Sequence, residues 1–141
     1  MVPLRDDSFD LVFCDHGAMS FCDPSRSVSE VARLLRRGGA LVFNKATLLL
    51  YLSWNPAKKR QSTRLHSSYF DSRIYDFGEG TIDFQITYGD WIRLFRSHGM
   101  LVEDLLELRP PVDATTTYDD FVPHDWARRW PAEEIWKVRK L

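Results

Sequence analysis

Four consecutive residues combine side chains that could do chemistry: Cys14-Asp15-His16-Gly17. They follow an apolar run that begins at Phe9, is too short for a helix and is rich in strand-forming residues. In open α/β sheets ligands bind beyond the carboxyl ends of strands, so Asp15 and His16 could orient a bound substrate or take a proton from it. The alternatives are a turn-forming aspartate and a solvated loop histidine. Gly17 is more readily explained by backbone geometry than by ligand contact.

The segment after this loop predicts a helix and a second strand. Asp23 is a candidate N-cap, and Pro24 suits the first helical position. Apolar residues then recur at helical spacing, and Gly38 is the expected left-handed cap before an apolar strand over 40–43. A strand–helix–strand crossover of this kind belongs to a parallel sheet, in which we expect both faces of the first strand to be covered.

The rest of the chain predicts an α/β fold with an antiparallel element near its end. Residues 48–80 form a long aromatic connection, typical of a lid or binding loop. The alternation over 81–88 indicates a half-buried strand with its aliphatic and aromatic side chains on one face. Asp90 is the expected N-cap of a helix that Gly99 ends, and a strand is expected over 100–108. Residues 132–141 could be a helix that Pro131 opens or a closing strand, and their β-favouring residues favour the strand.

Bulk properties exclude several classes of function. The chain has 141 residues and a net charge of −1, which argues against a nucleic-acid or anionic-membrane footprint. Its longest apolar run is far too short to span a bilayer. Two cysteines form no disulfide framework, which favours a reduced, cytoplasmic protein, and the four histidines match no metal-ligand spacing. We therefore predict no metal site.

Several segments together resemble a known family. L-R-D-D-S-F-D-L-V-F-C-D-H-G-A-M-S-F-C-D-P, S-E-V-A-R-L-L-R-R-G-G-A-L-V-F and G-D-W-I-R-L-F-R-S-H-G-M-L-V-E-D-L resemble the class I S-adenosylmethionine-dependent methyltransferases, and most of all the ubiquinone and menaquinone biosynthesis group. The closing I-W-K-V-R-K resembles the family's last, antiparallel strand. The resemblance implies a Rossmann-like mixed sheet in one domain over 1–141, S-adenosylmethionine as cofactor and a small-molecule methyl acceptor.

The resemblance also implies roles for particular residues. Residues 1–47 would be a strand–helix–strand core in which Cys14, Asp15 and Gly17 contact the cofactor and Asp15 and His16 serve catalysis. Residues 48–80 would be the lid, and 81–141 the C-terminal strands and helix. Within the lid, Trp54, His66 and Tyr69 could shape the acceptor pocket. Ordinary packing of these aromatic side chains is the alternative.

Two departures from the family lead to a further expectation. The glycine-rich motif of the first strand is absent, and so is the acidic residue that holds the ribose hydroxyls. We therefore expect the C-terminal half of a methyltransferase that begins at an internal or misassigned methionine. The alternatives are a catalytically inactive fragment and a binding or regulatory module, which could dimerise through its exposed first strand.

Overall fold

The computed structural model describes residues 4–71, 74–76, 82–116 and 122–141, and its centre is a mixed four-stranded sheet. The strands are β1 (Phe9–Asp15), β2 (Leu35–Ala46), β8 (Glu133–Lys140) and β7 (Met100–Glu107), in that spatial order. β1 and β2 are parallel, whereas β8 runs antiparallel to both β2 and β7. The predicted α/β class and the antiparallel last strand are confirmed, and that strand lies inside the sheet between β2 and β7.

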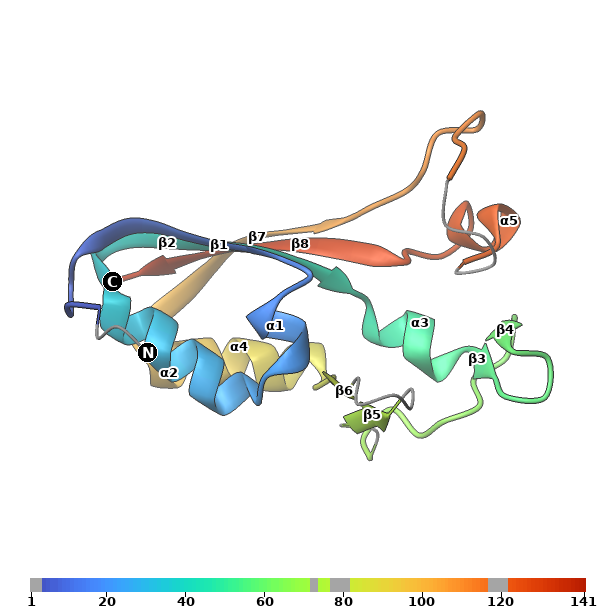
Figure 1. Ribbon diagram of the computed structural model, residues 1–141, viewed down its shortest axis with the longest axis horizontal. Helices are drawn as coiled ribbons and strands as arrows, with labels where there is room; N and C mark the ends of the chain where they lie inside the picture. Colours follow the sequence, from blue (N-terminus) through green and yellow to red (C-terminus); the bar gives the residue numbers. More distant parts are fainter. Residues whose placement is uncertain (1–3, 72–73, 77–81, 117–121) are drawn as a thin grey trace.

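Helices cover one face of this sheet. α1 (Ala18–Phe21), α2 (Pro24–Leu34) and α4 (Tyr88–Ser97) lie on the same side in Figure 1. The core between these layers is rich in aromatic rings: Phe43, Trp91, Phe95 and Trp136 are buried, with neighbouring ring centroids 5.5–6.2 Å apart. This packing fixes β2 and β8, the strands that reach the candidate site.

The other face of the sheet is open over the described residues, contrary to the prediction that both faces of β1 are covered. Val12 and Cys14 point toward the helices, whereas Leu11 and Phe13 are 53% and 75% exposed. Because side chains alternate along a strand, one face of β1 packs against the helices and the opposite face is exposed. β1 is also an edge strand in the described sheet, with β2 as its partner.

The connection from α2 to β2 differs from the prediction. Asp23 and Pro24 do begin the helix, and the Asp23 side chain accepts a hydrogen bond from Ser25 N at 2.8 Å. The helix nevertheless ends at Leu34, because Leu35 already pairs with Phe9 in the sheet. Gly38 has the expected positive φ of 78°, but it lies in an irregularity of β2 and not at the helix end.

The segment before α4 also corrects two expectations. Regular pairing there is limited to β6 (Ile82–Phe84), opposite β5 (Ile74–Asp76), and the buried side chains are the polar ones, Asp83 and Gln85. They point inward because they meet a buried lysine, described below. The N-cap of α4 is Thr87, whose hydroxyl accepts a hydrogen bond from Asp90 N and donates one to Asp90 Oδ2, so Asp90 is the third residue of the helix.

The predicted lid is ordered over most of its length. It contains α3 (Leu48–Leu52) and a short hairpin of β3 (Trp54–Asn55) and β4 (Arg60–Gln61). Leu50 and Tyr51 pack with Trp126 and Ala127 of α5 (His124–Ala127) in a second, smaller core. Residues 72–73 and 77–80 of the predicted lid, and residue 81 of the predicted strand, lie outside the described residues. In the described part of the chain, no helix is long and apolar enough to cross a membrane.

Candidate functional site

The tip of β1 carries the residues that the sequence singled out. Cys14 and Asp15 end the strand, and His16 follows with a positive φ of 45°, a backbone conformation uncommon outside glycine. A Cβ atom on Gly17 would lie 3.0 Å from Cys14 Sγ, so only glycine fits there without displacing that thiol. Close packing against Cys14 thus explains Gly17. The backbone of His16 is fixed by a hydrogen bond from His16 N to Asn44 O of 3.1 Å.

Two residues from neighbouring strands meet this tip. Asn44 of β2 donates a hydrogen bond from Nδ2 to Asp15 Oδ1 at 3.3 Å. Glu133, the first residue of β8, has Oε1 3.4 Å from His16 Nε2. Asp15, His16, Asn44 and Glu133 therefore form one polar cluster, which we call the tip cluster.

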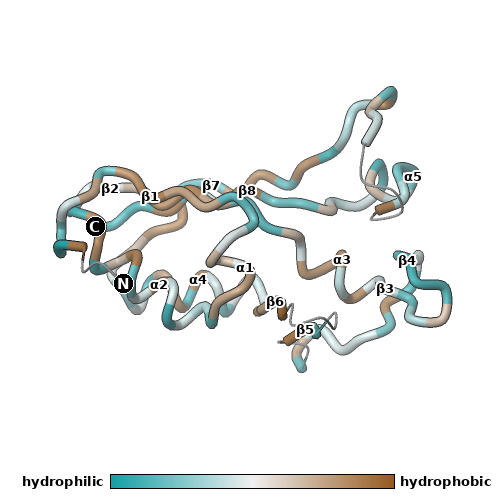
Figure 2. Tube along the Cα trace, in the orientation of Figure 1, coloured by the Kyte–Doolittle hydropathy of each residue, from teal (hydrophilic) through white to brown (hydrophobic). Residues whose placement is uncertain are grey.

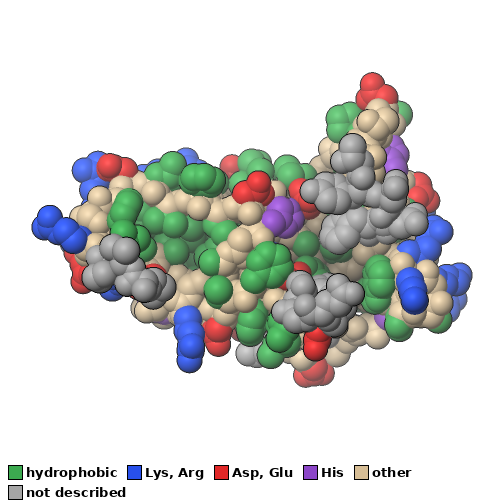
Figure 3. All heavy atoms as spheres, viewed as in Figure 1, with side chains coloured by type: hydrophobic (Ala, Val, Ile, Leu, Met, Phe, Trp, Pro, Cys, Tyr) green, Lys and Arg blue, Asp and Glu red, His purple; other side chains and the backbone are tan. Residues whose placement is uncertain are grey.

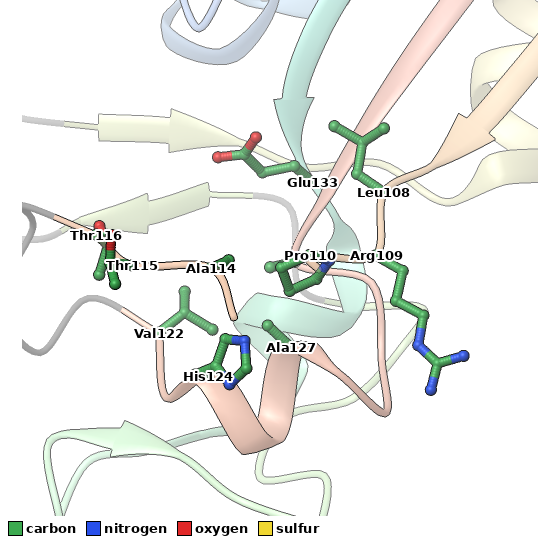
Figure 4. Close-up of a pocket in the computed structure, with 11 residues that line it drawn as sticks. Leu108, Arg109, Pro110, Ala114, Thr115, Thr116, Val122, His124, Ala127 and Glu133 are labelled. Atoms are coloured by element: carbon green, nitrogen blue, oxygen red, sulfur yellow. The ribbon is translucent and has the colours of Figure 1, made fainter. Parts of the chain in front are cut away.

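A pocket of about 480 Å³ adjoins the tip cluster. Glu133 lines it together with residues of the segment between β7 and β8, among them Pro110, Val122 and His124. Figure 4 shows Glu133 and Leu108 on one side, with Val122, His124 and Ala127 on the other. His124 Nε2 lies 2.9 Å from Pro111 O, which fixes the ring against the pocket wall. The lining is largely apolar, as expected of a small-molecule site.

The three predicted acceptor residues lie elsewhere. Trp54 belongs to the β3–β4 hairpin, His66 Nε2 lies 2.8 Å from Ser62 Oγ, and Tyr69 packs edge-on against Phe70. None of them lines the pocket beside Glu133. Their role in acceptor binding stays a prediction. Among the described residues, no group of three or more His, Cys, Asp or Glu side chains could hold a metal ion.

A charged group is buried on the helix-covered face next to the tip cluster. Lys45 follows Asn44 on β2, is fully buried, and donates a hydrogen bond to Gln85 Oε1. Its ammonium lies 5.4 Å from the centroid of the Trp91 ring, and its cross-strand partner is the buried Glu134. Burial lowers the pKa of Lys45 to about 8, although Glu134 and Asp83 oppose that shift. Burial likewise raises the pKa of Glu134.

Tyrosine hydroxyls complete this buried layer. Tyr88 donates to Glu134 Oε2 at 2.8 Å, and Tyr51 donates to Asp83 Oδ2. Burial raises the pKa of both tyrosines, so they stay protonated as donors at neutral pH. Lys45 could not be predicted as a buried group, because the strand expected over 40–43 continues in the structure to Ala46. Glu133 and Glu134 belong to β8, a strand with no motif of its own.

Comparisons with known proteins agree with this architecture. A family model described as a methyltransferase domain matches residues 1–43. A solved structure from Listeria monocytogenes, described as an S-adenosylmethionine-dependent methyltransferase, aligns with a TM-score of 0.75 and 13% identity over 99% of this chain and 65% of its own. One from Mesorhizobium loti aligns with a TM-score of 0.71 and 20% identity, with the same coverages. The fold is that of the S-adenosylmethionine-dependent methyltransferases.

Geranyl diphosphate C-methyltransferase from Streptomyces coelicolor shares the methyltransferase fold as well. It aligns with a TM-score of 0.60 and 13% identity over 100% of this chain and 50% of its own. No curated protein matches the chain. At these identities the likeness is one of fold, and the chain spans 65% of the length of the first two methyltransferase structures.

Proposed function

We propose that this protein takes part in S-adenosylmethionine-dependent methyl transfer to a small-molecule acceptor. The observation that carries the proposal is the contact between His16 and Glu133 at the carboxyl end of β1, beside a 480 Å³ pocket, in a methyltransferase fold. The match of residues 1–43 to a methyltransferase domain supports it. A subtype related to the ubiquinone and menaquinone enzymes is part of the proposal on the sequence resemblance alone.

The residues at the tip of β1 fit the methionine end of the cofactor. Asp15 is exposed, and its second carboxylate oxygen can accept from an ammonium group. Asn44 Oδ1 is buried and has no hydrogen-bond partner among the described residues, which leaves an acceptor beside Asp15. Gly17 keeps this surface free of a side chain. When bound, the cofactor supplies an electrophilic methyl group on a positively charged sulfur.

The chain's own groups then have separate tasks. Asp15 and Asn44 orient the bound amino-acid group, because both lie at the end of a strand held in the sheet. Nδ1 of His16, the ring nitrogen that does not face Glu133, could take the proton that an acceptor hydroxyl or amine gives up, and Glu133 would orient the ring through Nε2. The apolar pocket walls exclude water from the acceptor, and alignment in a dry site is a large part of such catalysis.

Calorimetry with S-adenosylhomocysteine tests this proposal. We expect micromolar binding by the protein and at least a tenfold loss, about 1.4 kcal/mol, in Asp15→Asn. Asp10→Asn is the matched control, because Asp10 lies on the same strand but pairs with Arg36 away from the tip. Its affinity should stay within twofold of wild type. Micromolar binding excludes the alternatives in which the chain has lost the cofactor site. No binding by the wild-type chain contradicts the catalytic proposal.

A second candidate is self-association through β1. Leu11 and Phe13 are more than half exposed on an edge strand, a combination that native proteins usually cover. Two copies could pair their β1 edges about a two-fold axis and bring the Leu11 and Phe13 side chains of both copies into contact across the open face. We expect light scattering to give the mass of a dimer for the wild type and of a monomer for Phe13→Lys. A wild type that is still monomeric at about 100 µM contradicts this candidate, because its dimerisation free energy would then be weaker than about −5.5 kcal/mol.

A further inference from the structure

A basic pocket lies between the β3–β4 hairpin and α5, at the end of the molecule opposite the C-terminus (Figure 1). It has a volume of about 330 Å³. The two elements are joined by a hydrogen bond from Trp126 Nε1 to Ser62 O of 2.9 Å. In Figure 3 Lys and Arg side chains gather at this end of the molecule, and Figure 2 shows the hairpin as strongly hydrophilic. The pocket shares no lining residue with the one beside Glu133.

Three cations face this pocket against one carboxylate. Lys58 and Arg60 come from the hairpin and Arg129 follows α5, whereas Asp125 is the acidic residue of the lining. None of the three cations forms an ion pair with any described residue. The pocket therefore has unneutralised positive charge, which favours an anionic ligand.

Local structure holds these cations in place before any ligand binds. Asn55 Oδ1 accepts hydrogen bonds from Ala57 N at 3.0 Å and Lys58 N at 3.1 Å, which fixes the hairpin turn. The Arg129 guanidinium lies 4.5 Å from the centroid of the Trp130 ring. A stacked guanidinium has fewer conformations to lose on binding, and its edge can still donate to an oxyanion.

Gln61 supplies an independent sign of a ligand. Its side chain lines the pocket and is 6% exposed, and its Oε1 has no hydrogen-bond partner among the described residues. A buried acceptor left unpaired costs folding free energy of about 1–3 kcal/mol. A ligand that donates a hydrogen bond to Oε1 would recover that loss. The pocket thus favours a ligand that has a negative charge and at least one O–H or N–H donor.

We propose that this pocket binds a phosphate group that retains a P–OH. The oxyanion would accept from Lys58, Arg60 and Arg129, and the P–OH would donate to Gln61 Oε1. The indole of Trp130 provides an apolar surface for an organic substituent. Two sources share this chemistry, free inorganic phosphate and a phosphate monoester. The proposal requires no methyltransferase activity, so it stands or falls separately from the tip cluster.

Calorimetry at pH 5, where inorganic phosphate and its monoesters both retain a P–OH, and at constant ionic strength tests the proposal with three anions: inorganic phosphate, phenyl phosphate and sulfate. We expect saturable phosphate binding with a Kd of about 1 mM or tighter. Sulfate should bind at least fivefold more weakly, because it has no proton to donate to Gln61. Tighter binding of phenyl phosphate assigns the pocket to a monoester, and tighter binding of inorganic phosphate assigns it to the free anion.

Matched variants separate a built site from surface charge. Arg60→Gln and Arg129→Gln should each weaken phosphate binding at least fivefold, and both positions are exposed, so the fold should persist by circular dichroism. Lys59→Asn removes a charge from the same turn at a residue that does not line the pocket, and its positive φ of 49° suits asparagine. It should change the affinity less than twofold. Absence of saturation below about 10 mM, equal binding of sulfate, or an equal loss in Lys59→Asn overturns the proposal.

Discussion

Gly39→Ala is expected to destabilise the protein by about 3 kcal/mol, whereas a substitution at the adjacent Gly38 is tolerated. A Cβ atom on Gly39 would lie 2.9 Å from Arg36 O and 3.0 Å from Phe9 O. Both atoms are backbone, and Phe9 is held by its pairing with Leu35, so neither can move without disturbing the β1–β2 contact. Urea unfolding followed by circular dichroism measures the loss as a lower midpoint.

Gly38→Asn is the matched control. Gly38 has a φ of 78° and no atom within 4 Å of an added Cβ, so space is available and only the backbone conformation is demanding. Asparagine enters the left-handed region more readily than other non-glycine residues, and we expect a cost below about 1 kcal/mol. Equal stabilities of the Gly39→Ala and Gly38→Asn proteins would show that the close approach at Gly39 is not tight.

The same glycine pair shows how far local sequence rules reach. The positive φ of Gly38 could be predicted, because glycine is the usual residue there. Its place in the fold could not, since the helix end at Leu34 depends on the pairing of Leu35 with Phe9, residues far apart in sequence. The three extra residues of β2 between its pairings with Phe9 and Leu11 follow from that contact and not from any local pattern.

Half of the tip cluster could be predicted for a comparable reason. Asp15 and His16 are expected at the end of an apolar strand, and the structure has them at the carboxyl end of β1; their role as site residues stays a prediction. Glu133 reaches His16 only because β8 inserts beside β2, and nothing near it in sequence marks that insertion. Asp83 and Gln85 likewise point inward because of Lys45, a charged residue that follows the strand expected over 40–43 and that belongs to β2 in the structure.

Lys45→Met is expected to abolish a rise in stability above pH 8. The pKa of Lys45 is about 8 in the folded protein and 10.5 for the free side chain, so between these values the unfolded chain binds more protons. The free energy of unfolding of the wild type therefore increases with pH in this window. Below pH 8 the buried charge imposes its full cost, about 3 kcal/mol, and between pH 8 and 9.5 roughly 2 kcal/mol of it is relieved.

Chemical unfolding at half-unit steps from pH 7 to 9.5 measures this effect as the difference between wild type and variant. The upper limit avoids the tyrosines: burial raises the pKa of Tyr51 and Tyr88, so their ionisation would lower stability above about pH 10 and oppose the lysine. Lys59→Asn, at an exposed turn, removes one positive charge without burial and should keep the wild-type slope. A wild-type slope in Lys45→Met would mean that the Lys45 ammonium is hydrated in solution, and that the contacts with Gln85 and Trp91 do not hold it in the core.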